Sequence, residues 1–230
     1  RTNNVVRNII FAVINGVIGT LLPFAVRTCT IRYLGSEYMG LNNLCSSILT
    51  VLSATDLGVA NAFAFRLYQP VAEHDKAKVC SLLNFYKKVY FVVGMVILSI
   101  GLMILPFFKC FISQNMPQGV NVYFIFFLYL INTVISYTIF AYKNISFAAD
   151  QRKDYESITT SVTFGLLYIS QMFLIAAGHY QISVCMLPLC TLLGNILRNL
   201  IACCKYPDYF PKGTISKDVK EALKNDIFSV

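Results

Sequence analysis

The chain has 230 residues, of which 57% are hydrophobic and 13% are charged, with a net charge of +8 and a mean hydropathy of +0.62. A soluble domain averages about 25% charged and 45–50% apolar residues, so one globular core could not bury this much apolar surface. The composition excludes an ordinary soluble domain. We interpret the positive charge as a feature of membrane topology rather than of nucleic-acid binding.

Charge-free runs of membrane-spanning length recur along the chain, because a bilayer core of about 30 Å needs ~20 apolar residues. We predict six spans, at residues 5–31, 41–67, 86–108, 120–142, 158–177 and 182–203. The second is the weakest, because it contains Asp56 and many other polar residues. The first is too long for a signal peptide, whose apolar region has about 7–15 residues. The predicted fold class is an all-α membrane protein, with a six-helix transmembrane bundle over residues 1–204.

The distribution of Lys and Arg predicts the orientation of this bundle. Alternating the six spans places sixteen of the nineteen basic residues on one side and only Arg27, Arg32 and Lys109 on the other. Basic residues stay on the cytoplasmic side of short loops. Both ends of the chain are therefore expected in the cytoplasm, and the even number of spans agrees with this.

The segments between the spans carry most of the charge. Residues 70–85 can form a short cytoplasmic helix, and residues 205–230 are expected to be a cytoplasmic linker with an amphipathic helix after Ser216. Asp150 and Asp154 have the spacing of paired catalytic acids, but Arg152 and Lys153 lie between them and favour a solvated loop. The chain opens on Arg1 and stops in an apolar beginning, so we expect a fragment of a longer protein.

No motif for catalysis or metal binding is present. The sequence lacks a Walker lysine motif, H-E-x-x-H and G-x-S-x-G, and its two histidines are expected on opposite sides of the membrane. We therefore predict no enzyme activity, no metal site and no cofactor, and leave coupling to H+ or Na+ open. The eight cysteines form no C-x-x-C pair and are interpreted as buried small side chains. A disulfide among the outer-side cysteines is the alternative, and these are Cys29, Cys45, Cys110 and Cys185.

Polar residues recur at helical spacing within several predicted spans. The second span carries a stripe that contains Asn42, Ser46, Thr50, Ser53 and Asp56. Similar stripes include Asn8, Asn15 and Arg27 in the first span, Tyr129, Asn132, Ser136 and Lys143 in the fourth, and Thr191, Asn195 and Arg198 in the sixth. Such residues serve either as contacts between helices or as the lining of a wet cavity.

The charged members need a partner or water. Arg27 is expected about 9 Å below the outer end of its helix and Asp56 about 22 Å below Leu41, at 1.5 Å per residue, so the two should not touch. We predict that Asp56 pairs with Arg198 or Lys143 and that Arg27 is left unpaired in an outer cavity. A guanidinium there would suit a phosphate group. Arg32 could assist it or serve as an interface anchor.

Several segments resemble one family of membrane transporters. They are LLPF (21–24) followed by Arg27, YLGSEYMGL (33–41), DLG (56–58), LNFYKK (83–88) and KYP (205–207). In these segments the chain resembles the polysaccharide (O-antigen type) flippases of the multidrug/oligosaccharidyl-lipid/polysaccharide exporter superfamily. The resemblance covers nearly the whole chain and places it as the N-terminal six-helix lobe of a two-lobed, V-shaped exporter, truncated before the second lobe.

The resemblance implies export of undecaprenyl-diphosphate-linked oligosaccharide across the bacterial cytoplasmic membrane. Its partners would be membrane lipids, the absent second lobe and polysaccharide polymerase machinery, with no nucleic acid. A cationic cavity in the family suits Arg27, with Arg66, Lys143 and Arg198 as further contacts, although only Arg27 and Asp56 match position by position. Two alternatives stay open, a multidrug or cation antiporter of the same superfamily and a membrane-embedded polymerase or glycosyltransferase.

Overall fold

The computed structural model describes residues 2–53, 59–112, 117, 119–150 and 152–214. Over these residues the secondary structure is entirely helical, as predicted. The α-helices are α1 (Thr2–Tyr33), α2 (Ser36–Ser53), α3 (Val59–Ala72), α4 (Lys76–Ile104), α5 (Val122–Thr138), α6 (Asn144–Ala149), α7 (Lys153–Ala176) and α8 (Tyr180–Lys205). Two 3-10 helices, η2 (Leu105–Phe111) and η3 (Ala141–Lys143), follow α4 and α5.

The length and hydropathy of the helices identify a membrane protein. Within the described ranges, four helical segments are long and apolar enough to cross a bilayer, namely Val6–Tyr33, Lys76–Phe111, Lys153–Ala176 and Tyr180–Lys205. A fifth results if Val122–Thr138 and Ala141–Ala148, which meet at a bend of 46°, form one broken span. The second span was predicted at residues 41–67. In the structure this range holds parts of two helices, α2 and α3, and residues 54–58 between them lie outside the described residues.

The third predicted span begins earlier than expected. We predicted a separate short helix over residues 70–85, but α4 runs without interruption from Lys76 to Ile104. Asp75 caps it, since its carboxylate accepts a hydrogen bond from the backbone N–H of Lys78. Val79 and Leu83 are buried in this first part of α4, so they belong to the core of the bundle and not to a detached loop.

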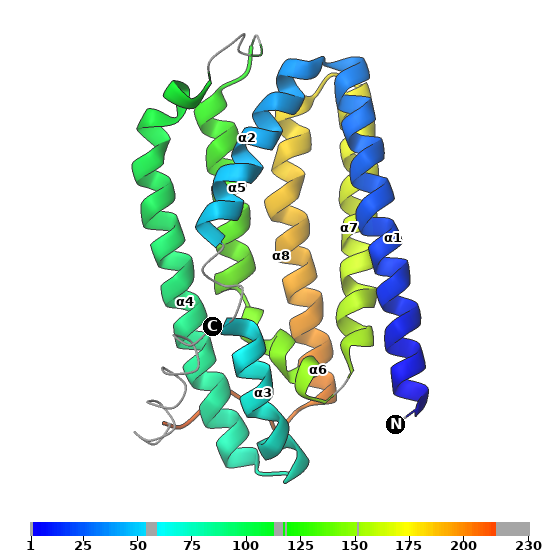
Figure 1. Ribbon diagram of the computed structural model, residues 1–230, viewed down its shortest axis with the longest axis vertical. Helices are drawn as coiled ribbons and strands as arrows, with labels where there is room; N and C mark the ends of the chain where they lie inside the picture. The colour runs from blue at the N-terminus through cyan, green and yellow to red at the C-terminus, as the bar shows by residue number, and fades with distance from the viewer. Residues whose placement is uncertain (1, 54–58, 113–116, 118, 151, 215–230) are drawn as a thin grey trace.

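The long helices stand side by side in the order α4, α5, α8, α7 and α1, each packing on the next (Figure 1). α2 crosses this row near its upper end and packs on α5 and α1, while α3 and α6 contact each other at the lower end. The segments predicted on one side of the membrane also lie at one end of the bundle. The start of α1, the α3–α4 connection, α6 and the end of α8 are all at the lower end (Figure 1).

Asp154 corrects one prediction at this lower end. We expected a solvated loop, but its side chain is only 1% exposed and accepts hydrogen bonds from Arg7 at 2.9 Å and Arg152 at 3.0 Å. Asn8 adds to the contact, because its side-chain oxygen accepts from the backbone N–H of Asp154. A carboxylate can be buried here because two guanidinium groups compensate its charge.

The segment after α8 returns beneath the bundle to α4. Asp208 forms an ion pair with Lys76 at 2.6 Å, and Asn84 donates a hydrogen bond to the carbonyl of Gly213. Tyr206 donates to the carboxylate of Asp150 at 2.6 Å. Burial and this hydrogen bond raise the pKa of Tyr206, so the hydroxyl keeps its proton. The predicted amphipathic helix after Ser216 lies outside the described residues.

Candidate functional site

The polar stripe of α2 borders two adjacent hollows in the upper part of the bundle. The first, here called the Arg27 cavity, measures about 190 Å³ and is lined by Arg27, Asn42, Ser46 and Tyr129, among others. The second, the α2–α5 groove, measures about 470 Å³ and continues along the stripe through Thr50 and Ser53. Ser46, Tyr129 and Leu187 line both, so the two hollows are adjacent.

Asn42 organises the wall between α2, α5 and α8. Its side-chain oxygen accepts hydrogen bonds from the hydroxyl groups of Tyr129 at 3.1 Å and Tyr180 at 2.6 Å. These three side chains come from three helices, and an amide oxygen has the capacity to accept both bonds. Asn42 was predicted as a cavity residue. The structure places it at the cavity edge, where it also fixes two tyrosines.

Arg27 lies on α1 with an exposed side chain, and of the residues that the structure describes it is the only charged one that lines the Arg27 cavity or the α2–α5 groove. Within the described ranges it forms no ion pair. The rest of the lining combines apolar side chains with neutral hydrogen-bonding ones, which include Thr30, Asn43 and Gln171. A guanidinium in such a place has donors available to an anionic ligand. Arg32 is exposed on the same helix but does not line the cavity.

Further down, the predicted stripes of α5 and α8 meet each other directly. Thr191 donates to the side-chain oxygen of Asn132 at 2.6 Å, and Asn195 donates to the carbonyl of Ile135 at 3.1 Å. Asn132 also lines the α2–α5 groove. The stripe of α1 behaves differently below Arg27, because Asn15 accepts from Ser161 of α7 and so forms a contact between helices.

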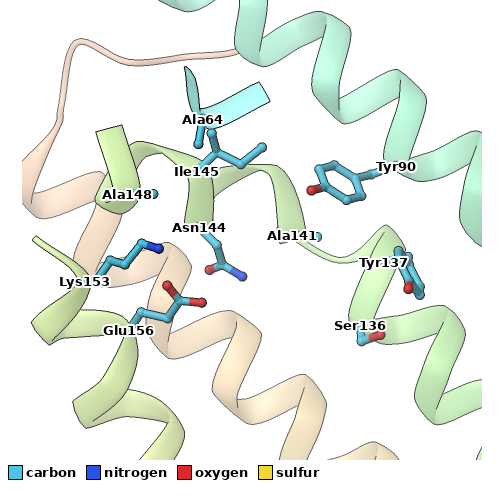
Figure 2. A pocket seen from close by; sticks show the side chains of 10 residues that line it. All are labelled: Ala64, Tyr90, Ser136, Tyr137, Ala141, Asn144, Ile145, Ala148, Lys153 and Glu156. Carbon is cyan, nitrogen blue, oxygen red and sulfur yellow. The ribbon is translucent and has the colours of Figure 1, made fainter. Parts of the chain in front are cut away.

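A third hollow, the inner cavity, opens one turn further along α5. It measures about 320 Å³, and its polar lining comes from Ser136, Tyr137, Asn144, Lys153 and Glu156 (Figure 2). Glu156 and Lys153 of α7 lie beside Asn144 of α6, while Tyr90 of α4 and Tyr137 face them from the other side (Figure 2). The three hollows therefore lie one after another along α5, from the upper to the lower part of the bundle, and each has polar side chains in its lining.

The remaining predicted residues are distributed at the lower end. Arg198 bonds to the carbonyl of Gly194 and to Asn195, and it also interacts electrostatically with Glu156. Lys143 is buried and donates to the sulfur of Cys203. Arg66 is exposed on α3. Asp56 lies outside the described residues, so its predicted pairing with Arg198 or Lys143 stays a prediction.

Glu156 was missed by sequence reasoning, and it is the acidic residue of the inner cavity. The sequence offers only a weak indication of a cavity residue here. Glu156 follows the charged residues 152–154 closely, and this pattern is typical of the end of a loop. Tyr168 and Gln171 were also missed on α7, where they line the Arg27 cavity three residues apart. That spacing on one helix face was available in the sequence. All eight cysteines are free, including the four that were predicted on the outer side.

Comparison with known proteins adds no relative to these observations. No protein-family model, no curated protein and no solved structure matches the chain.

Proposed function

We propose that the chain is one lobe of a bacterial flippase that moves lipid-diphosphate-linked oligosaccharide from the cytoplasmic to the outer leaflet of the inner membrane. In this proposal the bundle has six spans, α2 and α3 together forming the second. Its ends lie in the cytoplasm, where the basic residues gather. A second lobe closes the polar face, and the two lobes rock about the substrate in alternating access. The protein is a transporter and not an enzyme.

One observation supports the proposal, namely that Arg27, which forms no ion pair with the described residues, lies beside hollows whose lining mixes apolar side chains with neutral polar ones. An ionisable group at membrane depth is costly and marks a substrate path. A guanidinium fork binds a phosphate through two hydrogen bonds. Hydroxyl and amide side chains such as Asn43, Thr50 and Thr133 can exchange hydrogen bonds with the sugar hydroxyls of an oligosaccharide. The hollow therefore supplies groups for both parts of the substrate.

The experiment compares two arginines on the same helix in the full-length protein. Arg27→Ala should cause lipid-linked repeat units to accumulate on the inner leaflet and should reduce surface polysaccharide about tenfold or more, since a charge-assisted hydrogen bond contributes about 1.5–3 kcal/mol. Arg32→Ala is the matched control and should export normally, because Arg32 lies outside the cavity. Normal export by a strain that lacks the gene would refute the proposal.

A cation or drug antiporter is the second candidate, and the inner cavity favours it. There the carboxylate of Glu156 lies next to Asn144, and Tyr90 and Tyr137 line the opposite side of the same cavity (Figure 2). A carboxylate with aromatic rings can bind an organic cation, and it could also couple transport to H+ or Na+. The two candidates differ in their response to mutation. An antiporter loses drug resistance in Glu156→Gln and keeps it in Arg27→Ala, whereas the flippase fails in Arg27→Ala.

A further inference from the structure

Gln171 is a buried amide on α7 that lines the Arg27 cavity. Its side chain is 7% exposed, so it belongs to the wall of the cavity and not to the outer surface of the bundle. Tyr168 lies about one turn earlier on α7, lines the same cavity and interacts electrostatically with Arg27. Residues at this spacing share one face of a helix. This face of α7 therefore borders the same cavity as Arg27.

One hydrogen bond fixes the orientation of the Gln171 amide. The side-chain nitrogen donates to the backbone carbonyl of Ser183 on α8 at 3.1 Å. A carbonyl oxygen can only accept, so the amide atom that faces it must be the nitrogen and not the oxygen. The amide oxygen of Gln171 is therefore left to accept from another donor.

The protein supplies no such donor among the described residues, where the bond to Ser183 is the only one that the Gln171 side chain makes. Two hydroxyl groups that also line the cavity are engaged in their own helices. Thr30 donates to the carbonyl of Val26 at 2.8 Å, and Ser183 donates to the carbonyl of Tyr180 at 2.9 Å. Buried polar atoms almost always have a partner, because leaving one without a partner costs free energy. An acceptor left open in a cavity wall is suited to a donor that a ligand brings.

We propose that Gln171 is a specificity residue, which accepts a hydrogen bond from a hydroxyl group of the sugar next to the diphosphate. This inference rests on the proposed function, in which Arg27 binds the diphosphate of the lipid-linked oligosaccharide. Arg27 has donors only, which suit phosphate oxygens, whereas the amide oxygen of Gln171 suits an O–H group. Only a diphosphate that carries a sugar satisfies both residues, so the cavity prefers it to a diphosphate without one.

Gln181 provides a matched control at the start of α8. Its amide nitrogen also donates to a backbone carbonyl, that of Gly119, at 3.3 Å. Gln181 is not among the described residues that line the three hollows. Methionine keeps an unbranched side chain of similar length without the amide. Gln171→Met and Gln181→Met therefore each remove one such bond, but only Gln171→Met removes an acceptor from the cavity.

The experiment compares two ligands of equal charge, a short-chain prenyl diphosphate whose terminal phosphate carries either glucose or a methyl group. Isothermal titration calorimetry measures their affinities for the full-length protein in detergent. Wild type and Gln181→Met should bind the glucosyl ligand at least about fivefold more tightly than the methyl ligand. Gln171→Met should lose this preference and bind the methyl ligand as wild type does. Arg27→Ala should weaken the binding of both ligands about tenfold or more, because both carry the diphosphate.

The possible outcomes separate this inference from the proposed function. If Gln171→Met weakens both ligands equally, or neither, while Arg27→Ala weakens both, the role of Gln171 is overturned alone. Unchanged affinity of Arg27→Ala for both ligands would overturn the proposed function and this inference together. If Gln171→Met does not fold, glucosyl ligands that each lack one hydroxyl group decide the matter with the wild-type protein. Loss of the preference on removal of one hydroxyl supports the role of Gln171, and full affinity for every such ligand overturns it.

Discussion

The guanidinium of Arg7 donates a hydrogen bond to the carboxylate of Asp154 at 2.9 Å, which ties the second turn of α1 to the first turn of α7. Arg7 is half exposed, whereas Asp154 is 1% exposed and also bound by Arg152. α1 packs mainly on α7, and its apolar faces are otherwise open. The Arg7–Asp154 contact therefore adds a polar link at this end to the packing of α1 on α7.

Asp154→Asn should destabilise the bundle. It leaves two guanidinium groups without their counter-ion, and the loss should be about 2–3 kcal/mol, below the 3–5 kcal/mol of a fully buried pair because Arg7 is solvated. The measurement is the midpoint of thermal unfolding in detergent. Asp208→Asn is the control, since its partner Lys76 and Asp208 itself are exposed and such pairs contribute under about 1 kcal/mol. Equal shifts in the two variants would contradict this account.

Gly101→Ala should separate α4 from α5. A Cβ at this position would overlap the side chain of Leu130, which is completely buried, with Leu130 Cδ2 only 2.8 Å away. Overpacking of this kind costs about 1–3 kcal/mol. Gly16→Ala on α1 is the matched control, because nothing lies within 4 Å of its Cβ. Thermal unfolding should show a lower midpoint for the first variant only, and an unchanged midpoint for Gly101→Ala would exclude close contact between these helices.

Asn42→Ala should loosen the wall shared by α2, α5 and α8. The change removes the acceptor that both tyrosine hydroxyls share, and leaving the buried hydroxyl of Tyr180 unpaired should cost about 1–2 kcal/mol. Asn43→Ala tests the specificity, since Asn43 is exposed and its side chain makes no hydrogen bond among the described residues. Limited proteolysis and thermal unfolding both measure the effect. The hydrogen-bonding role of Asn42 would be refuted by equal sensitivity of the two variants.

The α2–α5 groove should contain water. In a variant whose native cysteines are replaced by serine, Ser46→Cys and Thr50→Cys should react with a membrane-impermeant thiol reagent, because both positions line the groove. Val51→Cys should react at least about tenfold more slowly, since a thiol in contact with lipid rarely ionises. Val51 is 74% exposed, adjacent in sequence, and does not line the groove. Similar labelling at Thr50 and Val51 would mean that α2 does not border a wet hollow.

The sequence alone determined the membrane character of the protein, its all-helical structure and the end of the bundle at which each loop lies. Crossing a bilayer requires apolar runs of a minimum length, and these are visible without any tertiary information. Helical periodicity also placed Asn42, Ser46, Thr50 and Ser53 on one face of α2, and the structure confirms that shared face. Periodicity assigns a face to a residue, but it does not say which helix that face meets.

Tertiary structure decided the partners. Polar stripes of the same kind have different surroundings on different helices. The stripe on α2 borders a hollow, whereas Asn15 in the stripe on α1 contacts α7. On α5, Asn132 accepts a hydrogen bond from Thr191 of α8. Asp154 was predicted to be solvated because its neighbours in the sequence are charged. Its partner Arg7 is 147 residues away, so the sequence pattern did not reveal their contact. Burial of a charge depends on groups brought together from distant segments, and only folding brings them together.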